Sequence, residues 1–91
     1  MRIELTVPGL LQPTIGGVRT THLDASTLDE ALDVMRKKFP LLVPHVYDDT
    51  GHIRRHVMVY YNDESVMWIK DKNIPLKEGD RIQVIQAISG G

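Results

Sequence analysis

The sequence predicts an α+β domain in which one main helix packs on one face of a mixed sheet of about five strands. Three observations lead to this prediction. The 91 residues have the length of one domain. One strong amphipathic helix pattern stands between two groups of strand patterns. No apolar run approaches the ~18 residues of a membrane span.

The first two strands are predicted by alternation. Residues 3, 5 and 7 are apolar, whereas residues 2, 4 and 6 are polar, which is typical of a half-buried strand. Proline and glycine then mark residues 8–17 as a loop. Residues 18–23 are rich in β-branched side chains and resume the strand pattern. The two strands are expected to form a hairpin with a long loop.

The helix over residues 28–39 has clear start and stop signals. Ser26 and Thr27 are both N-cap residue types, and Thr27 with Glu30 has the spacing of a capping box. Basic residues 36–38 fill the last turn, and Pro40 ends the helix. One face carries the apolar residues expected to enter the core, which are Leu28, Ala31, Leu32, Met35 and Phe39.

The second half of the chain predicts three more strands. Residues 40–52 look irregular, although Leu41, Leu42, Val46 and Tyr47 are expected to pack. Residues 57–61 are apolar on both faces, which indicates a central strand covered on part of each side. Residues 62–64 form a turn, 66–69 a short strand, 73–78 a loop or one 3₁₀ turn, 78–80 a turn and 81–87 the last strand.

The predicted order is strand, strand, helix, strand, short strand, strand. The helix crossover allows the first and last strands to pair in parallel at the centre of the sheet. That arrangement is the β-grasp, the fold of ubiquitin. The order alone also fits other small α+β folds.

Composition excludes several classes of protein. The 11 Lys and Arg balance 12 Asp and Glu, with no basic block and only five aromatic residues, so no nucleic-acid surface is expected. The lack of cysteine excludes disulfides, thiolate catalysis and cysteine-ligated metals. The first four residues do not begin a signal peptide. We expect a small cytoplasmic protein that does not bind membranes.

The side chains do not predict catalysis. No Gly-rich phosphate loop and no Gly-x-Ser-x-Gly turn is present. His52 and His56 have a spacing that suits one strand face, but no third metal ligand is evident. The acidic pairs 48–49 and 63–64 lie in turns, where such residues usually serve backbone geometry. We therefore expect neither a catalytic residue nor a metal site.

The end of the sequence is the remaining feature. Residues 1–87 are expected to form the domain, and residues 88–91 a flexible tail that ends in Gly90 and Gly91. A terminal Gly-Gly is a weak signal by itself. It gains weight because it follows the last strand of a chain whose element order fits a β-grasp.

The sequence resembles the MoaD/ThiS family of ubiquitin-like sulfur carrier proteins over most of its length. The matching segments are the loop 13–17, the helix start at Thr27-Leu28, the strand and turn 56–64, the segment 76–82 and the tail 87–91. The branch that serves cysteine or related sulfur metabolism is the most similar. Ser89 departs from the alanine that often precedes Gly-Gly in this family.

The resemblance implies a reaction at the chain end. The carboxylate of Gly91 is adenylated by a partner of the ubiquitin-activating type, an adenylyltransferase that uses ATP. A sulfur donor then converts it to a thiocarboxylate, and a sulfur-accepting synthase receives the sulfur. Gly90 and Ser89 give the partner access to the tail, and a protease that trims the C-terminus is a further expected partner. The chain itself binds no cofactor.

A docking face near the tail is also expected. The best candidates are Ile85, Ala87 and Ile88, followed by Met58 and Tyr60. Two other functions stay open. The chain is alternatively a ubiquitin-like modifier joined through Gly91 to lysines, or a non-covalent β-grasp interaction module.

Overall fold

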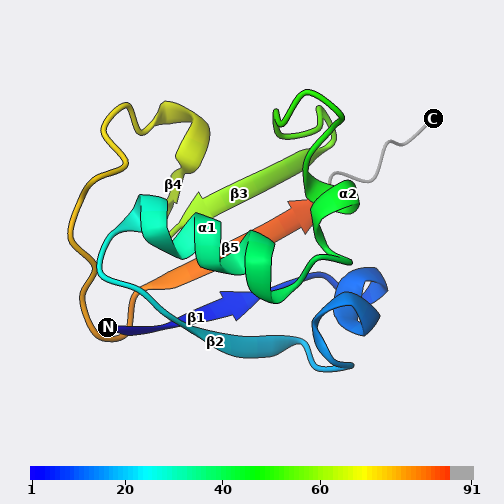
Figure 1. Ribbon diagram of the computed structural model, residues 1–91, viewed down its shortest axis with the longest axis horizontal. Coiled ribbons are helices and arrows are strands. Elements are labelled where there is room, and N and C mark those ends of the chain that lie inside the picture. Colours follow the sequence, from blue (N-terminus) through cyan, green and yellow to red (C-terminus); the bar gives the residue numbers. More distant parts are fainter. Residues whose placement is uncertain (87–91) are drawn as a thin grey trace.

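The computed structural model describes residues 1–86 and shows a five-stranded mixed sheet with one main helix across it (Figure 1). The elements in chain order are β1 (Arg2–Thr6), the 3₁₀ helix η1 (Gly9–Ile15), β2 (Thr20–Asp24), α1 (Leu28–Lys38), α2 (Val43–Val46), β3 (Val57–Tyr61), β4 (Glu64–Ser65), the 3₁₀ helix η2 (Val66–Trp68) and β5 (Arg81–Gln86).

The strand order is β2-β1-β5-β3-β4, with β1 and β5 parallel and every other neighbouring pair antiparallel. This order confirms the predicted β-grasp. The hairpin of β1 and β2 is also confirmed, with Ile3 opposite Leu23. The central parallel pair sets Leu5 beside Ile82.

Alternation along the strands directs one set of side chains toward α1. Ile3 and Leu5 of β1, Val59 of β3 and Ile82 and Val84 of β5 are buried in a single core. The helix contributes four of the five residues that the sequence predicted, which are Leu28, Ala31, Leu32 and Met35; the fifth, Phe39, is the C-cap and is partly buried. Each buried side chain of this size adds about 1.5–3 kcal/mol to the free energy of unfolding.

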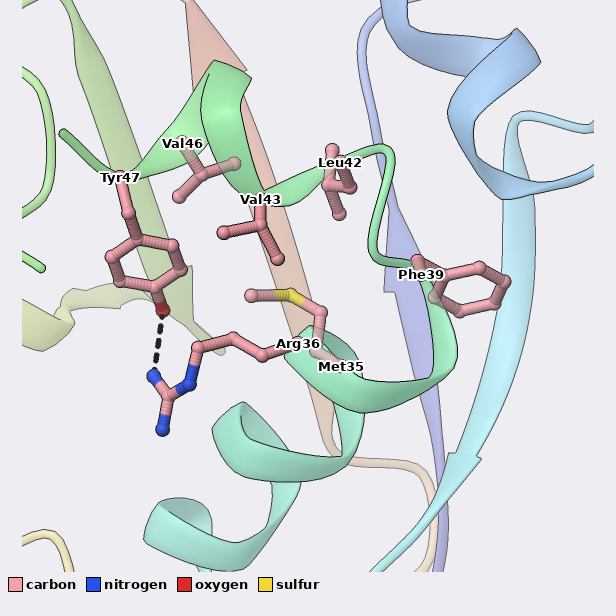
Figure 2. A pocket seen from close by; sticks show the side chains of 7 residues that line it. All are labelled: Met35, Arg36, Phe39, Leu42, Val43, Val46 and Tyr47. Atoms are coloured by element: carbon pink, nitrogen blue, oxygen red, sulfur yellow. Dashed lines mark hydrogen bonds between the residues drawn. The ribbon is translucent and has the colours of Figure 1, made fainter. Parts of the chain in front are cut away.

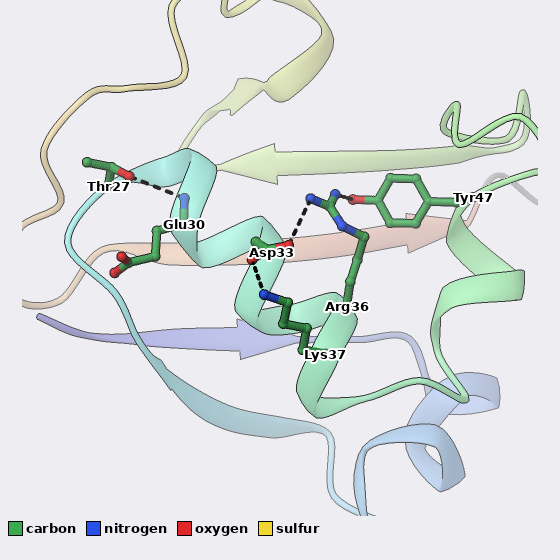
Figure 3. Close-up of polar contacts among 6 residues, drawn as sticks. All are labelled: Thr27, Glu30, Asp33, Arg36, Lys37 and Tyr47. Atoms are coloured by element: carbon green, nitrogen blue, oxygen red, sulfur yellow. Dashed lines mark hydrogen bonds and ion pairs between the residues drawn. The ribbon is translucent and has the colours of Figure 1, made fainter.

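The start of α1 confirms the capping prediction and decides between its two candidate residues. Thr27 is the N-cap, and its Oγ1 accepts a hydrogen bond of 3.2 Å from the backbone N–H of Glu30 (Figure 3). The Glu30 carboxylate accepts one of 2.7 Å from the N–H of Ser26. Farther along, Asp33 pairs with Lys37 at 2.9 Å on an exposed face, where such pairs add little stability.

The segment after α1 contains a short helix, α2, that the sequence analysis missed. Leu42 and Val46 are spaced by one turn, so both enter the core, and Tyr47 follows them. Leu41 points outward and is 68% exposed, so its predicted packing was wrong. Figure 2 shows this cluster, in which Arg36 donates a hydrogen bond of 3.2 Å to the Tyr47 hydroxyl.

Two further expectations were wrong. The loop 8–17 contains the 3₁₀ helix η1, which buries Leu11 and Ile15. The strand predicted for residues 66–69 is instead η2, preceded by the two-residue strand β4. The Ser65 hydroxyl accepts a hydrogen bond of 3.3 Å from the N–H of Met67 and so begins the turn. The remaining strands differ from prediction only at their ends.

One buried carboxylate, Asp80, joins the turn before β5 to the turn after β3. It accepts hydrogen bonds from the Tyr61 hydroxyl at 2.5 Å, the Asn62 amide at 3.2 Å and the N–H of Lys77 at 2.8 Å. The Asn62 side-chain oxygen accepts a bond of 3.0 Å from the N–H of Arg81. Asn62 has φ of 53°, a left-handed conformation that asparagine tolerates better than most residues.

These contacts change the pKa values of both side chains. Burial first, and then the Asp80 hydrogen bond and charge, raise the pKa of Tyr61 to about 12. Burial opposes ionisation of Asp80. Hydrogen bonds from Tyr61, the N–H of Lys77 and Asn62 outweigh it, and they hold the pKa of Asp80 below its usual range.

We predict that stability falls at both extremes of pH. Because the pKa of Asp80 is lowered on folding, its contribution is complete above pH ~4 and is lost as the pH falls through the folded value. Because the pKa of Tyr61 is raised on folding, the contribution of Tyr61 to stability is complete below pH ~10 and is lost as the pH rises through about 12. Urea denaturation of wild type and Asp80→Ala should differ by about 1–2 kcal/mol at pH 7 and converge in acid.

Ultraviolet titration of tyrosine provides the alkaline test. One of the three tyrosines should ionise late, and Tyr61→Phe should remove that phase. Tyr60→Phe is the matched control, because among residues 1–86 the one hydrogen-bond partner of the Tyr60 hydroxyl is the Met58 sulfur, at 3.8 Å. Loss of the late phase in Tyr60→Phe, and not in Tyr61→Phe, contradicts the assignment.

A second prediction concerns the helix cap. Thr27→Ala should lower the free energy of unfolding by about 1 kcal/mol, because it leaves the N–H of Glu30 without its partner. Ser26→Ala should change it by less than about 0.5 kcal/mol, because Ser26 bonds to Glu30 through its backbone. Chemical denaturation measures both. Equal losses in the two variants are incompatible with Thr27 as the cap.

Candidate docking face and the end of β5

β5 is paired on both edges along its first half and with β3 alone up to Gln86, the last residue that the structure describes. β1 pairs with its first half, Arg81 to Gln83, and β3 pairs with Ile82 through Gln86. Gln86 is opposite Val57 at the start of β3. The predicted site residues Ala87, Ile88, Ser89, Gly90 and Gly91 lie outside the described residues.

The structure brings the other three predicted docking residues together. Met58 is directly opposite Ile85 in the β3–β5 register. The Tyr60 hydroxyl lies 3.8 Å from the Met58 sulfur. All three alternate with the buried residues Val59 and Val84, so they point away from α1. Met58 is 39% exposed, and Tyr60 and Ile85 are half-buried. We call Met58, Tyr60 and Ile85 the open face.

Beside the open face lies a groove that sequence reasoning missed. It has a volume of about 400 Å³ and lies between β3 and η2, and we call it the Trp68 groove. Its lining residues are Ile53, Arg54, Arg55, Val57, Met58, Tyr60, Ser65, Met67 and Trp68. Trp68 is 79% exposed and Met67 is 68% exposed. A strand at residues 66–69 would have alternated these side chains, whereas one 3₁₀ turn buries Val66 and Ile69 and exposes the two between them.

A second groove of about 250 Å³ lies on the other side of the end of β5. Thr6, Val7, Pro8 and Arg19 line it, together with residues 83–86. The last described residues of β5 thus border open space on the side of β1. A partner can reach the chain here without disturbing the core.

Three of the groups considered for metal binding or catalysis, Asp48, His52 and Asp63, make contacts with neighbouring side chains. The Thr50 hydroxyl lies 2.7 Å from the His52 ring and donates to Asp48 at 2.6 Å. This bond, with the backbone N–H of His52, holds the pKa of Asp48 below its usual range. Asp63 pairs with Arg81 at 2.9 Å. Within residues 1–86, no three His, Asp or Glu side chains gather so as to hold a metal ion.

The helices give no sign of a membrane span. Over the part of the chain that the structure describes, none has the length and apolar character needed to cross a bilayer. The cluster in Figure 2, which runs from Tyr47 past Val43 and Met35 to Phe39, is closely packed and leaves no room for a ligand. We take the surfaces around the end of β5 as the candidate functional site, because three of the predicted docking residues lie together there.

Comparison with known proteins places the chain among similar small proteins. The profile of the ThiS family matches residues 5–91. The sulfur carrier protein CysO of Mycobacterium tuberculosis is 24% identical over 93 aligned residues, which cover 100% of both chains. The structure of SAMP1 from Haloferax volcanii matches with a TM-score of 0.76 and 26% identity, over 100% of both chains.

A third match concerns a complex. A chain of the Amycolatopsis orientalis BexX/CysO complex has a TM-score of 0.77 and 22% identity, over 98% of this chain and 99% of that one. These matches span the whole β-grasp, including the central β1–β5 pair.

Proposed function

The chain belongs to the ThiS family, and from this we propose that it is a sulfur carrier protein that acts through the carboxylate of Gly91. The observation that carries the proposal is the family match, which continues through residue 91. The similarity to CysO, a protein named as a sulfur carrier that aligns with this chain over the full length of both, also supports the proposal.

The proposed chemistry has two steps. A carboxylate oxygen of Gly91 attacks the α-phosphorus of ATP held by a partner adenylyltransferase, pyrophosphate leaves, and an acyl-adenylate forms. Sulfide from a donor then attacks the acyl carbon, the carbon–oxygen bond to AMP breaks, and a terminal –CO–S⁻ remains. A synthase that makes cysteine, homocysteine or a related metabolite accepts the sulfur.

In this proposal the chain is a co-substrate rather than an enzyme. It supplies the reacting carbon at Gly91. Gly90 passes through a narrow entrance because glycine has no Cβ, and Ser89 before it carries a small side chain. The open face, with Ala87 and Ile88, contacts the partner. The partner supplies the ATP site. The pairing of β5 with β3 up to Gln86 supports this proposal, because it fixes the position of the residue that precedes the proposed tail.

A ubiquitin-like modifier is the second candidate. The structural match to SAMP1, the small archaeal modifier protein 1 of Haloferax volcanii, favours this function. The same acyl-adenylate would react with the amine of a lysine, release AMP and form an isopeptide bond. Only the nucleophile differs between the two functions.

Intact-mass measurement tests the carrier function. Incubation with the adenylyltransferase of the source organism, ATP and sulfide should add about 16 Da, because one sulfur replaces one oxygen. Iodoacetamide should then label the product once, at the C-terminus, because the chain has no cysteine thiol to compete. Deletion of Gly90 and Gly91 should abolish both the mass gain and the label.

Leu10→Ala provides the control, because Leu10 is 87% exposed on η1 and lies outside the candidate site. This variant should gain mass like the wild type. A wild-type chain that gains no mass with an active partner refutes the proposal. Higher-mass adducts that survive reducing, denaturing gels and depend on Gly91 favour the modifier.

A further inference from the structure

The most exposed aromatic side chain within the described residues is Trp68, and it stands on a groove rather than alone. The Trp68 groove measures about 400 Å³, more than ten times the roughly 30 Å³ that one water molecule occupies. Met58, Met67 and Trp68 supply apolar surface around it. Tryptophan in such a position is enriched among the residues that dominate binding energy in interfaces.

The charge of the groove is one-sided. Arg54 and Arg55 line it, and none of its lining residues is acidic. The chain as a whole has a net charge of −1, so the positive charge of the groove is opposite in sign to that of the whole chain. Arg54 donates a hydrogen bond of 2.7 Å to the Pro44 carbonyl, which fixes its direction, and Arg55 is exposed.

The acidic residues at either end of β3 have other partners or positions. Asp48, before β3, accepts hydrogen bonds from Thr50 and from the N–H of His52. Asp63, after β3, is paired with Arg81. Among residues 1–86, no ion pair engages Arg54 or Arg55, so the groove offers apolar surface beside two arginines.

Its position links it to the tail. Val57, which lines the groove, is opposite Gln86, the last described residue of β5. Met58 belongs to both the groove and the open face. A protein that covers the open face while it holds the tail thus extends naturally into the groove.

We propose that the Trp68 groove is the specificity anchor for the adenylating partner, and that it receives a partner segment with an apolar side chain flanked by carboxylates. The apolar side chain packs between Met58 and Trp68, and the carboxylates face Arg54 and Arg55. This inference rests on the proposed function, because the adenylating enzyme is the partner it names. It adds which segment of that enzyme is recognised and by what chemistry.

Tryptophan fluorescence gives a direct test, because Trp68 is the only tryptophan in the chain. The probe is the adenylyltransferase of the source organism, with its own tryptophans replaced by phenylalanine and without ATP. Binding should shift the emission of Trp68 to the blue and protect it from acrylamide. Binding with unchanged emission and quenching overturns the proposal, as does the absence of binding.

Variants separate the anchor from the rest of the surface. Trp68→Ala should weaken binding about 30-fold, as for an aromatic anchor. Arg55→Glu should weaken it about 10-fold and remove the decline in affinity with added salt. Leu10→Ala should leave the affinity within about 2-fold. Lys37→Glu, which makes the same charge change on α1, should also leave it within about 2-fold.

The outcomes for docking and for function are distinct. If wild type and Trp68→Ala gain sulfur with the same KM for the carrier, the carrier function stands and the anchor is wrong. If the wild type gains no sulfur, the carrier function is wrong, and the binding measurement without ATP still decides the anchor. A loss of affinity in Lys37→Glu equal to that in Arg55→Glu assigns the effect to net charge and overturns the proposal.

Discussion

The constraint on which the rest of the structure depends is that one helix covers only one face of the sheet. α1 buries the side chains of β1, β3 and β5 that face it and completes a single core. The opposite side of β3 and β5 has no second layer among residues 1–86. In a two-layer domain of this kind, the helix covers one face of the sheet and leaves the other open to partners. The open face and the Trp68 groove belong to the uncovered side.

The elements that the sequence predicted well are those with a clear hydrophobic period or a clear capping signal. Alternation in β1 placed Ile3 and Leu5 in the core, and Thr27 with Glu30 marked the start of α1. The element order then limited the topology to few choices, because the crossover through α1 allows β1 and β5 to pair in parallel. Local chemistry and global fold point the same way in these segments.

The failures come from short segments of 3₁₀ or single-turn helix. Val66 and Ile69 are apolar and three residues apart, a spacing that fits a strand end as well as a 3₁₀ turn. The hydroxyl of Ser65 decides in favour of the turn, and the same turn exposes Trp68. Met58, Tyr60 and Ile85 lie close together in the structure, but their docking of a partner stays a prediction, as does the role of Gly91.

The parallel pairing of β1 with β5 also has a consequence for folding. It sets Glu4 beside Arg81, so the centre of the sheet joins segments from opposite ends of the sequence. Contacts of such long sequence separation are costly in loop-closure entropy and slow a folding reaction. During synthesis the sheet cannot close until β5 has been made, because β5 lies at its centre and follows the other four strands in the chain. Four strands must therefore wait for the one that joins them into a single sheet.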